Sequence, residues 1–446
     1  MKAYKAYIET LGCPKNIADS ENAAGLLEKS GIRIVNDPAD ADIIIVNTCG
    51  FINDAKKESI DTILDMAEYR KGGKTLVVTG CLSQRFNDEL FKEMPEIDIL
   101  LGVNDYANLP DIIHNHDYGK REKYQTTYEK EYLEIAERKL LENDYSAYLK
   151  VAEGCDNVCA YCVIPSIRGG YRSRRHEDVL AEAELLASKG IRELVLVAQD
   201  VTAYGSDHDS KYRLPQLLLD LCDIDGIRWI RLMYCYEDRI TPELIKVIAE
   251  KEKICKYIDI PIQHCSDKIL KAMNRRSTKR SIIDTVAKLR EAIPDIHIRT
   301  TLITGFPGET DVEFKELCEF VKTMKFERLG VFHYSKEEGT PAAVMKGQVR
   351  EQTKVRRKER LLALQQEIAL ESNLKKIGKI LEVLVEEKVE GEDTYIGRTG
   401  YDAREIDDSV IFSSEREHRP GDFVHVRIND AFDYDLTGEE IDYEFA

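Results

Sequence analysis

The sequence lacks any run of about 20 apolar residues, which is the length that a helix needs to cross a lipid bilayer. Residues 1–10 contain neither a long apolar stretch nor a cleavage site, so we expect no signal peptide. The sequence also lacks low-complexity tracts and internal repeats beyond an alternation of strand and helix patterns. These absences predict a cytoplasmic protein with no membrane partner.

An excess of positive charge is also missing. The chain has 64 Lys and Arg against 82 Asp and Glu, a net charge of -18. Because an acidic chain repels phosphate backbones, we expect that direct nucleic-acid binding is not required. In a reducing compartment the 11 cysteines do not form a disulfide framework, so they are buried small residues, metal ligands or catalytic thiols.

A length of 446 residues with 43% hydrophobic residues predicts two or three domains. Near the start, three short apolar runs each lead into a cysteine: residues 6–12 before Cys13, 43–46 before Cys49, and 76–78 before Cys81. β-Branched runs separated by helical patterns predict parallel βαβ units. Since the carboxyl ends of parallel strands share one edge, we expect all three cysteines on one rim of an α/β domain over residues 1–118.

The rest of the chain predicts four further segments. Residues 119–144 are charged and irregular and predict a linker. Six strand patterns within residues 145–350 alternate with helical ones and predict an open, partial βα barrel; they lie at 147–151, 194–198, 229–233, 257–260, 296–303 and 329–332. Residues 351–374 contain no Pro or Gly and predict a bridging helix. Residues 375–446 predict a small β-barrel, with strand patterns at 380–385, 394–398, 410–412 and 423–428.

The strongest chemical signal is the spacing C-x3-C-x2-C of Cys155, Cys159 and Cys162, directly after the first predicted strand of the open barrel. Three thiolates this close wrap one metal centre. A four-iron cubane held by three thiolates keeps one iron open to the amino and carboxylate groups of an amino acid. Two other interpretations are a zinc site with a distant ligand such as His176, and three unrelated buried cysteines.

This cysteine motif resembles that of the radical S-adenosylmethionine (radical SAM) superfamily. The resemblance implies that the three cysteines hold a 4Fe–4S cluster, which donates one electron to SAM and so generates a 5'-deoxyadenosyl radical. It also implies that Tyr161 lies near the adenine and that the segment 303–310 approaches the cofactor closely at Gly305 and Gly308. The alternative for this segment is an ordinary strand–turn–helix capped by Thr310.

Nearly the whole chain resembles the methylthiotransferases of that superfamily, which combine a cysteine-bearing N-terminal domain, a radical SAM barrel and a small β-barrel called the TRAM domain. The resemblance implies that Cys13, Cys49 and Cys81 hold a second, auxiliary 4Fe–4S cluster. One SAM would supply the methyl group, and another would supply the radical. The auxiliary cluster would deliver the methylthio group, and an external donor would supply the electrons. Coincidence of three buried thiols is the other interpretation. Five cysteines match no cluster motif and are predicted core residues: Cys222, Cys235, Cys255, Cys265 and Cys318.

Two branches of that family differ in substrate. One modifies an adenosine of transfer RNA, and the other modifies the β-carbon of an aspartate in ribosomal protein S12 of the small subunit. Segments 11–16, 162–169, 198–205 and 334–340 resemble the ribosomal-protein branch. Gln199 ends the second barrel strand, so we expect it to contact the cofactor; a turn-stabilising amide is the alternative.

Charge favours the same branch. From Lys375 onward the chain has 9 Lys and Arg against 20 Asp and Glu, a net charge of -11. A barrel that binds RNA should be basic, whereas this one would attract a basic ribosomal protein; a solvated acidic surface is the plain alternative. We therefore expect a monomeric aspartate methylthiotransferase. The alternatives are a transfer-RNA methylthiotransferase, a radical enzyme whose N-terminal cluster only relays electrons, and a non-catalytic iron–sulfur scaffold or carrier.

Overall fold

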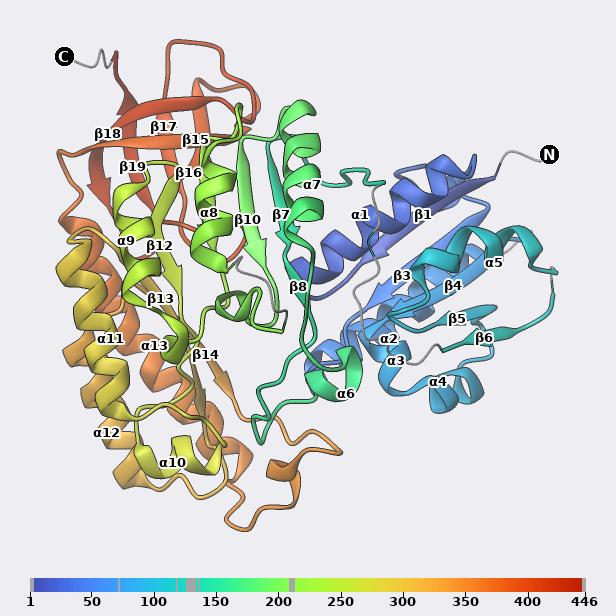
Figure 1. Cartoon of the computed structure of the whole chain (residues 1–446), viewed down its shortest axis with the longest axis horizontal. Coiled ribbons are helices and arrows are strands. Elements are labelled where there is room, and N and C mark those ends of the chain that lie inside the picture. The colour runs from blue at the N-terminus through green and yellow to red at the C-terminus, as the bar shows by residue number, and fades with distance from the viewer. Residues whose placement is uncertain are drawn as a thin grey trace.

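The computed structural model describes residues 4–70, 73–117, 119–125, 134, 137–207 and 213–442. Three units follow one another along the chain: a parallel α/β sheet, an open parallel barrel and a closed barrel (Figure 1). The α/β unit, blue to cyan in Figure 1, lies at one side of the open barrel, and the closed barrel, in red, covers one of its ends. The α/β fold class predicted from the sequence is confirmed.

The N-terminal sheet is parallel throughout and has the order β2-β1-β3-β4-β5-β6. Its strands are β1 (Lys5–Thr10), β2 (Arg33–Ile34), β3 (Ile43–Thr48), β4 (Thr75–Gly80), β5 (Ile99–Leu101) and β6 (Glu122–Tyr124). Every residue of β3 and β4 is buried, as expected for central parallel strands that helices cover on both faces. Strand β6 lies inside the segment predicted as a linker, so the sheet continues beyond residue 118; residues 126–133 of that segment lie outside the described residues.

Two layers of helices enclose this sheet. Helices α1 (Pro14–Lys29) and α5 (Leu109–Asn115) share an apolar cluster on one face, around Leu27 and Leu109. Helices α2 (Asn53–Ala67) and α4 (Asn87–Glu93) share another on the opposite face, around Ile63 and Leu90. The short helix α3 (Cys81–Arg85) follows β4 directly. Pro14 is the first residue of α1, a position that suits proline because the first helical turn needs no backbone N–H there.

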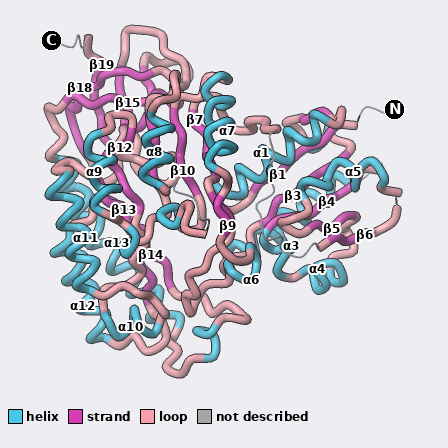
Figure 2. The backbone as a smooth tube through the Cα atoms, in the orientation of Figure 1, coloured by secondary structure: helices cyan, strands magenta, loops and turns pink. Residues whose placement is uncertain are grey.

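The open barrel contains all six predicted strands in one parallel sheet (Figure 2). In sheet order they are β14 (Arg328–His333), β13 (His297–Thr304), β12 (Ile254–Asp259), β11 (Trp229–Leu232), β10 (Glu193–Val197) and β7 (Ser146–Lys150). The helices around them are α7 (His176–Ser188), α8 (Leu214–Cys222), α9 (Pro242–Glu250), α10 (Asp267–Ala272), α11 (Lys279–Ala292) and α12 (Asp311–Met324). Between β7 and α7 lie the hairpin β8 (Ala152–Glu153) and β9 (Arg172–Ser173) and the short helix α6 (Ile164–Arg168).

Helix α13 (Glu351–Leu374) packs against β13 and β14 and leads into the closed barrel. The barrel strands, in the order in which they pair, are β15 (Ile380–Lys388), β16 (Thr394–Thr399), β17 (Val410–Ser413), β19 (Leu436–Glu440) and β18 (Phe423–Ala431). Strand β19 was missing from the sequence prediction. It closes the barrel by pairing with β17 and β18.

The closed barrel covers the amino ends of the open-barrel strands through buried ion pairs. Arg398 of β16 donates through NH1 to Glu193 at the start of β10 at 2.8 Å, and Arg231 of β11 donates through Nε to the same carboxylate at 3.0 Å. The segment after β16 enters the inner face of the open barrel, where Ala403 is buried in one cluster with Tyr257 and Asp407 accepts from Tyr257 Oη at 2.7 Å. The cysteine loop of the open barrel lies at the opposite end, where the strands have their carboxyl ends.

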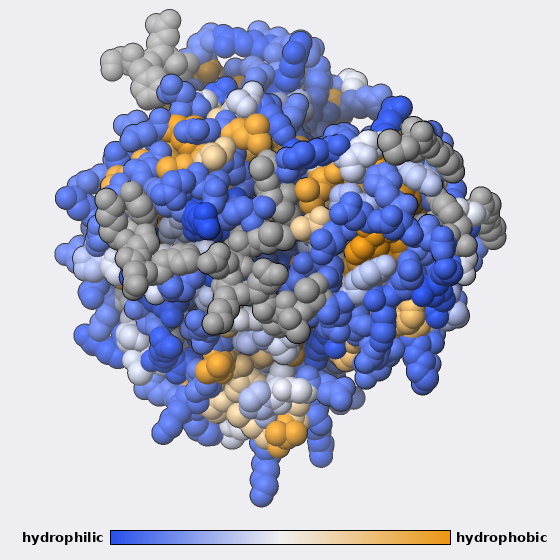
Figure 3. All heavy atoms as spheres, turned by 45° about the vertical axis from the view of Figure 1, so that its right-hand side comes forward, coloured by the Kyte–Doolittle hydropathy of each residue, from blue (hydrophilic) through white to orange (hydrophobic). Residues whose placement is uncertain are grey.

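The outer surface carries mainly hydrophilic side chains on the face seen in Figure 3, with apolar ones in small separate patches. Among the helices in the described ranges, none combines the length and the apolar character needed to cross a membrane.

Candidate functional site

The C-x3-C-x2-C motif lies in the loop between β8 and α6, at the carboxyl end of β7. Cys155 and Cys159 are buried, and Cys162 is half-buried. Burial raises the pKa of the Cys162 thiol to about 12, and the neighbouring Cys159 and Cys155 thiols add to this rise. Burial also raises the pKa of the Cys155 thiol. A strong positive charge such as a metal centre would favour the thiolate forms of Cys155 and Cys162.

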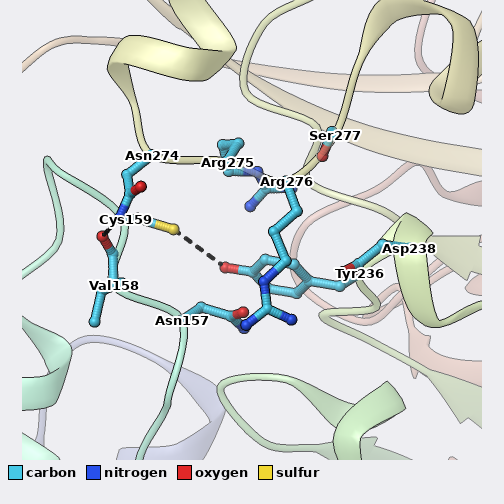
Figure 4. A pocket seen from close by; sticks show the side chains of 9 residues that line it. All are labelled: Asn157, Val158, Cys159, Tyr236, Asp238, Asn274, Arg275, Arg276 and Ser277. Atoms are coloured by element: carbon cyan, nitrogen blue, oxygen red, sulfur yellow. Dashed lines mark hydrogen bonds between the residues drawn. The ribbon is translucent and has the colours of Figure 1, made fainter.

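A small cleft of about 120 Å³ opens beside Cys159 (Figure 4). The Cys159 Sγ lies 3.6 Å from the Tyr236 hydroxyl, and the guanidinium of Arg275 stacks 4.3 Å from the centre of the Tyr236 ring. Arg275 is buried, yet within the described residues its Nε and NH1 atoms have no hydrogen-bond partner. A buried guanidinium with spare donors beside this cleft suits a carboxylate or another anion. The sequence analysis did not identify Tyr236 or Arg275 as site residues, although Tyr236 follows the end of the strand predicted at 229–233.

Tyr161 lies on an apolar cluster that contains Phe306, with the two ring centroids 6.4 Å apart. The structure thus brings Tyr161 to the glycine-rich segment 303–310. Gly305 has a φ of +72°, and a Cβ there would lie 2.3 Å from Lys354 Cγ of α13. The close approach predicted at Gly305 is therefore made by a helix of the same chain, whereas at Gly308 nothing lies within 4 Å of such a Cβ.

The three N-terminal cysteines meet at the carboxyl edge of their parallel sheet. Cys13 precedes α1, Cys49 follows β3, and Cys81 begins α3. An added Cβ on Gly12 would lie 3.0 Å from Cys49 Sγ, which shows how closely the first cysteine loop approaches the second. Burial, together with the neighbouring Cys81 and Cys13 thiols, raises the pKa of Cys49 to about 12. The structure places these thiols on one rim, as the topology predicts.

No group of three His, Cys, Asp or Glu side chains in the described residues could hold a single metal ion. His176, considered as a zinc ligand, instead pairs through Nε2 with Asp220 at 2.7 Å. A mononuclear zinc site is therefore not supported. In each set the neighbouring thiols contribute to the raised pKa of one member, Cys49 in the first and Cys162 in the second. An iron–sulfur cluster is larger than one ion and is bound by thiolates. The residues present fit such a cluster.

A buried network of charges joins the two cysteine rims. Arg168 donates through NH1 to Asp19 at 2.7 Å and to Glu153 at 2.9 Å, and Lys150 pairs with the same two carboxylates. Through NH2, Arg168 also donates to Cys81 Sγ at 3.4 Å. Burial disfavours the ionised form of Glu153, but Arg168 and Lys150 hold its pKa well below the usual range. Lys150, the last residue of β7, and Arg168 of α6 thus connect the open barrel directly to the N-terminal unit.

Gln199, predicted to contact the cofactor, donates through Nε2 to Glu153 Oε1 at 2.7 Å. This bond ties the end of β10 to the charged network. Of the five cysteines predicted as core residues, four are buried and Cys318 is half-buried.

Family models match three parts of the chain: uncharacterized protein family UPF0004 at residues 5–102, the radical SAM superfamily at 149–321, and the TRAM domain at 377–441. Among solved structures, the chain resembles the radical S-adenosylmethionine methyltransferase TsrM from Kitasatospora setae, which contains cobalamin and a [4Fe-4S] cluster. That likeness has a TM-score of 0.56 at 14% identity and covers 77% of each chain, so it concerns the fold alone.

Curated relatives match over almost the full length. The protein of Desulforamulus reducens named ribosomal protein uS12 methylthiotransferase RimO is 50% identical over 435 residues, 96% of this chain and 98% of the relative. The protein of the same name from Clostridioides difficile is 48% identical over 444 residues, 99% of this chain and all of the relative. The chain belongs to the RimO family, within the radical SAM superfamily.

Proposed function

We propose that this chain is a radical SAM enzyme that adds a methylthio group to the β-carbon of an aspartate in ribosomal protein uS12. One observation carries the proposal: Arg168, six residues after Cys162, donates to Cys81 Sγ at 3.4 Å. The segment after Cys162 thus packs against Cys81, which supports one substrate region shared by the two cysteine sets. An enzyme that both makes a carbon radical and inserts sulfur needs both centres at one substrate.

The proposed cofactors are two 4Fe–4S clusters and SAM, with Cys155, Cys159 and Cys162 holding one cluster and the N-terminal cysteines the other. When bound, these groups supply the one-electron chemistry that breaks an unactivated C–H bond and delivers sulfur, which no side chain could do. The side chains around these groups would bind SAM and orient the substrate. We expect Arg275 to offer its spare donors to the carboxylate of SAM, and Tyr161, which packs beside Phe306, to lie near its adenine.

Charge supports a basic protein as substrate. Many acidic residues of the closed barrel are exposed, namely Glu387, Glu390, Glu392, Asp393, Glu405, Glu415, Glu417, Asp422, Asp430 and Glu439. Others serve the interface with the open barrel: Arg328 pairs with Asp402 at 2.5 Å and Asp408 at 2.7 Å. We expect a monomer that acts in the cytoplasm with an external electron donor.

The test is anaerobic incubation of the reconstituted protein with SAM, a reductant and a peptide that carries the uS12 loop, followed by mass analysis. A mass gain of one methylthio group, absent when the target aspartate is alanine, supports the proposal. Modification of transfer RNA with an unchanged peptide would assign the chain to the other substrate. Failure to cleave SAM after reduction would point to a scaffold.

A further inference from the structure

Lys15, the second residue of α1, is a lysine with only 8% of its surface exposed. Its Nζ lies 3.6 Å from the centre of the Tyr234 ring. Within the described ranges, this ammonium has neither a hydrogen-bond acceptor nor a carboxylate at ion-pair distance. Its one close polar contact is therefore the face of an aromatic ring.

The neighbouring charges balance without Lys15. The cations Lys150 and Arg168 pair with the carboxylates Asp19 and Glu153, two against two. Lys15 is thus an additional buried positive charge. Removing an ammonium from water is unfavourable, and a single cation–π contact offsets only part of that cost. The position of Lys15 therefore favours binding of an anion that none of these side chains supplies, such as an anionic group of a ligand.

The position of this ammonium relates it to both cysteine sets. Lys15 follows Cys13 by two residues, at the N-terminal rim. Tyr234 lies at the carboxyl end of β11, two residues before Tyr236, whose hydroxyl is 3.6 Å from Cys159 Sγ. Tyr234 and Tyr236 are both only half-buried, and Tyr236 lines the cleft beside Cys159. An anion bound to Lys15 would hold its adjacent atoms between the two sets.

We propose that Lys15 binds the β-carboxylate of the substrate aspartate and so selects aspartate over its neutral amide. The inference rests on the proposed function, since it names the group that recognises that substrate. The carboxylate of SAM has the same chemistry. Arg275, beside Cys159, is already available to it, which leaves Lys15 for the substrate.

The test uses the full chain, reconstituted with iron and sulfide, and three variants. Lys15→Met removes the charge at similar volume, and Lys15→Arg keeps the charge. Lys29→Met is the matched control, because Lys29 lies on the same helix with 66% of its side chain exposed. Without reductant, fluorescence anisotropy gives the Kd of the uS12-loop peptide with aspartate or with asparagine at the target position.

We expect the unchanged chain to prefer the aspartate peptide by about tenfold or more, the worth of a charged hydrogen bond. Lys15→Met should lose this preference, with an unchanged Kd for SAM and an unchanged iron content. Lys15→Arg should keep most of it, and Lys29→Met all of it.

Three results would overturn this inference and leave the proposed function standing. The first is an aspartate preference in Lys15→Met that equals that of the unchanged chain. The second is a weaker affinity of Lys15→Met for SAM with an unchanged affinity for the peptide, and the third is a loss of about half of the iron, which would make Lys15 a partner of the auxiliary cluster. If the unchanged chain neither binds nor modifies the aspartate peptide, the proposed function fails and the inference falls with it.

Discussion

The guanidinium of Arg168 lies 3.4 Å from the sulfur of Cys81, although 87 residues separate them along the chain. The same guanidinium donates to Asn16 Oδ1 at 2.7 Å, so one side chain of the open barrel contacts two helices of the N-terminal unit, α1 and α3. Hydrogen bonds to a thiolate ligand tune the potential of an iron–sulfur cluster. Arg168 thus both fixes the approach of the two units and polarises one proposed ligand.

Replacing Arg168 by Gln should destabilise this junction. The change leaves Asp19 and Glu153 buried with Lys150 as their remaining cation, and breaking a buried ion pair costs about 3–5 kcal/mol. We expect a clearly lower midpoint of thermal unfolding. Arg280→Gln is the control, since that side chain is 83% exposed and, within the part of the chain that the structure describes, pairs with Asp284 alone. Equal midpoints for the two variants would contradict the role of the network.

Removing either cysteine set should halve the iron. The unchanged reconstituted chain should contain about eight irons as two cubanes, and about four after all three cysteines of one set are changed to Ala. Without Cys13, Cys49 and Cys81, reductive cleavage of SAM should continue while methylthio transfer stops. Iron analysis and chromatography of the cleaved nucleoside measure both quantities. Cys318→Ala is the control, and about four irons in the unchanged chain would refute a second cluster.

Two glycines of one segment should respond differently to alanine. At Gly308 the strain of a φ of +87° alone costs about 1–2 kcal/mol. At Gly305 the same kind of strain is joined by a contact at 2.3 Å with Lys354 Cγ, for which overpacking adds about 1–3 kcal/mol. Gly305→Ala should therefore unfold at the lower temperature in a calorimetric scan. The reverse order would show that the space beside Gly305 is not limiting.

The interface of the two barrels should weaken in acid. Burial would raise the pKa of Glu193, but Arg398 and Arg231 hold it at about 2. Since the unfolded value is about 4.3, this group stabilises the fold fully above that pH and loses the effect as the pH falls toward 2, by about 3 kcal/mol. Unfolding midpoints between pH 7 and pH 3 should fall less steeply for Glu193→Gln than for the exposed control Glu319→Gln. Parallel pH profiles would exclude this contribution.

The exposed acidic charge of the closed barrel should strengthen binding of uS12. Changing Glu387, Glu390, Glu392 and Asp393 to amides should weaken binding and flatten its dependence on salt, because screening then has less attraction to reduce. The same number of amides at Asp54, Glu58, Asp61 and Asp65 of α2 gives a control of equal net charge. An affinity that is flat from low to high salt in the unchanged chain would count against this attraction.

Periodicity predicted the long elements well, including all six open-barrel strands, because buried parallel strands are continuous apolar runs. It missed β2, β5 and β6, which are two or three residues long and exist by pairing with neighbours. Cysteine spacing and the shared edge of parallel strands brought each cysteine set together. The contacts of Lys15 with Tyr234 and of Arg168 with Cys81 depend on how separate units pack, which local pattern does not encode.

The segment that places Ala403 and Asp407 beside Tyr257 covers the amino end of the open barrel from within. Because the cysteine loops lie at the opposite, carboxyl end, we expect the substrate to approach from that side. A loop that projects from a folded protein suits an approach from one end better than a strand that would have to pass through the barrel. The segment that covers the amino end belongs to the same acidic barrel that we expect to attract the substrate, so one unit would serve both purposes.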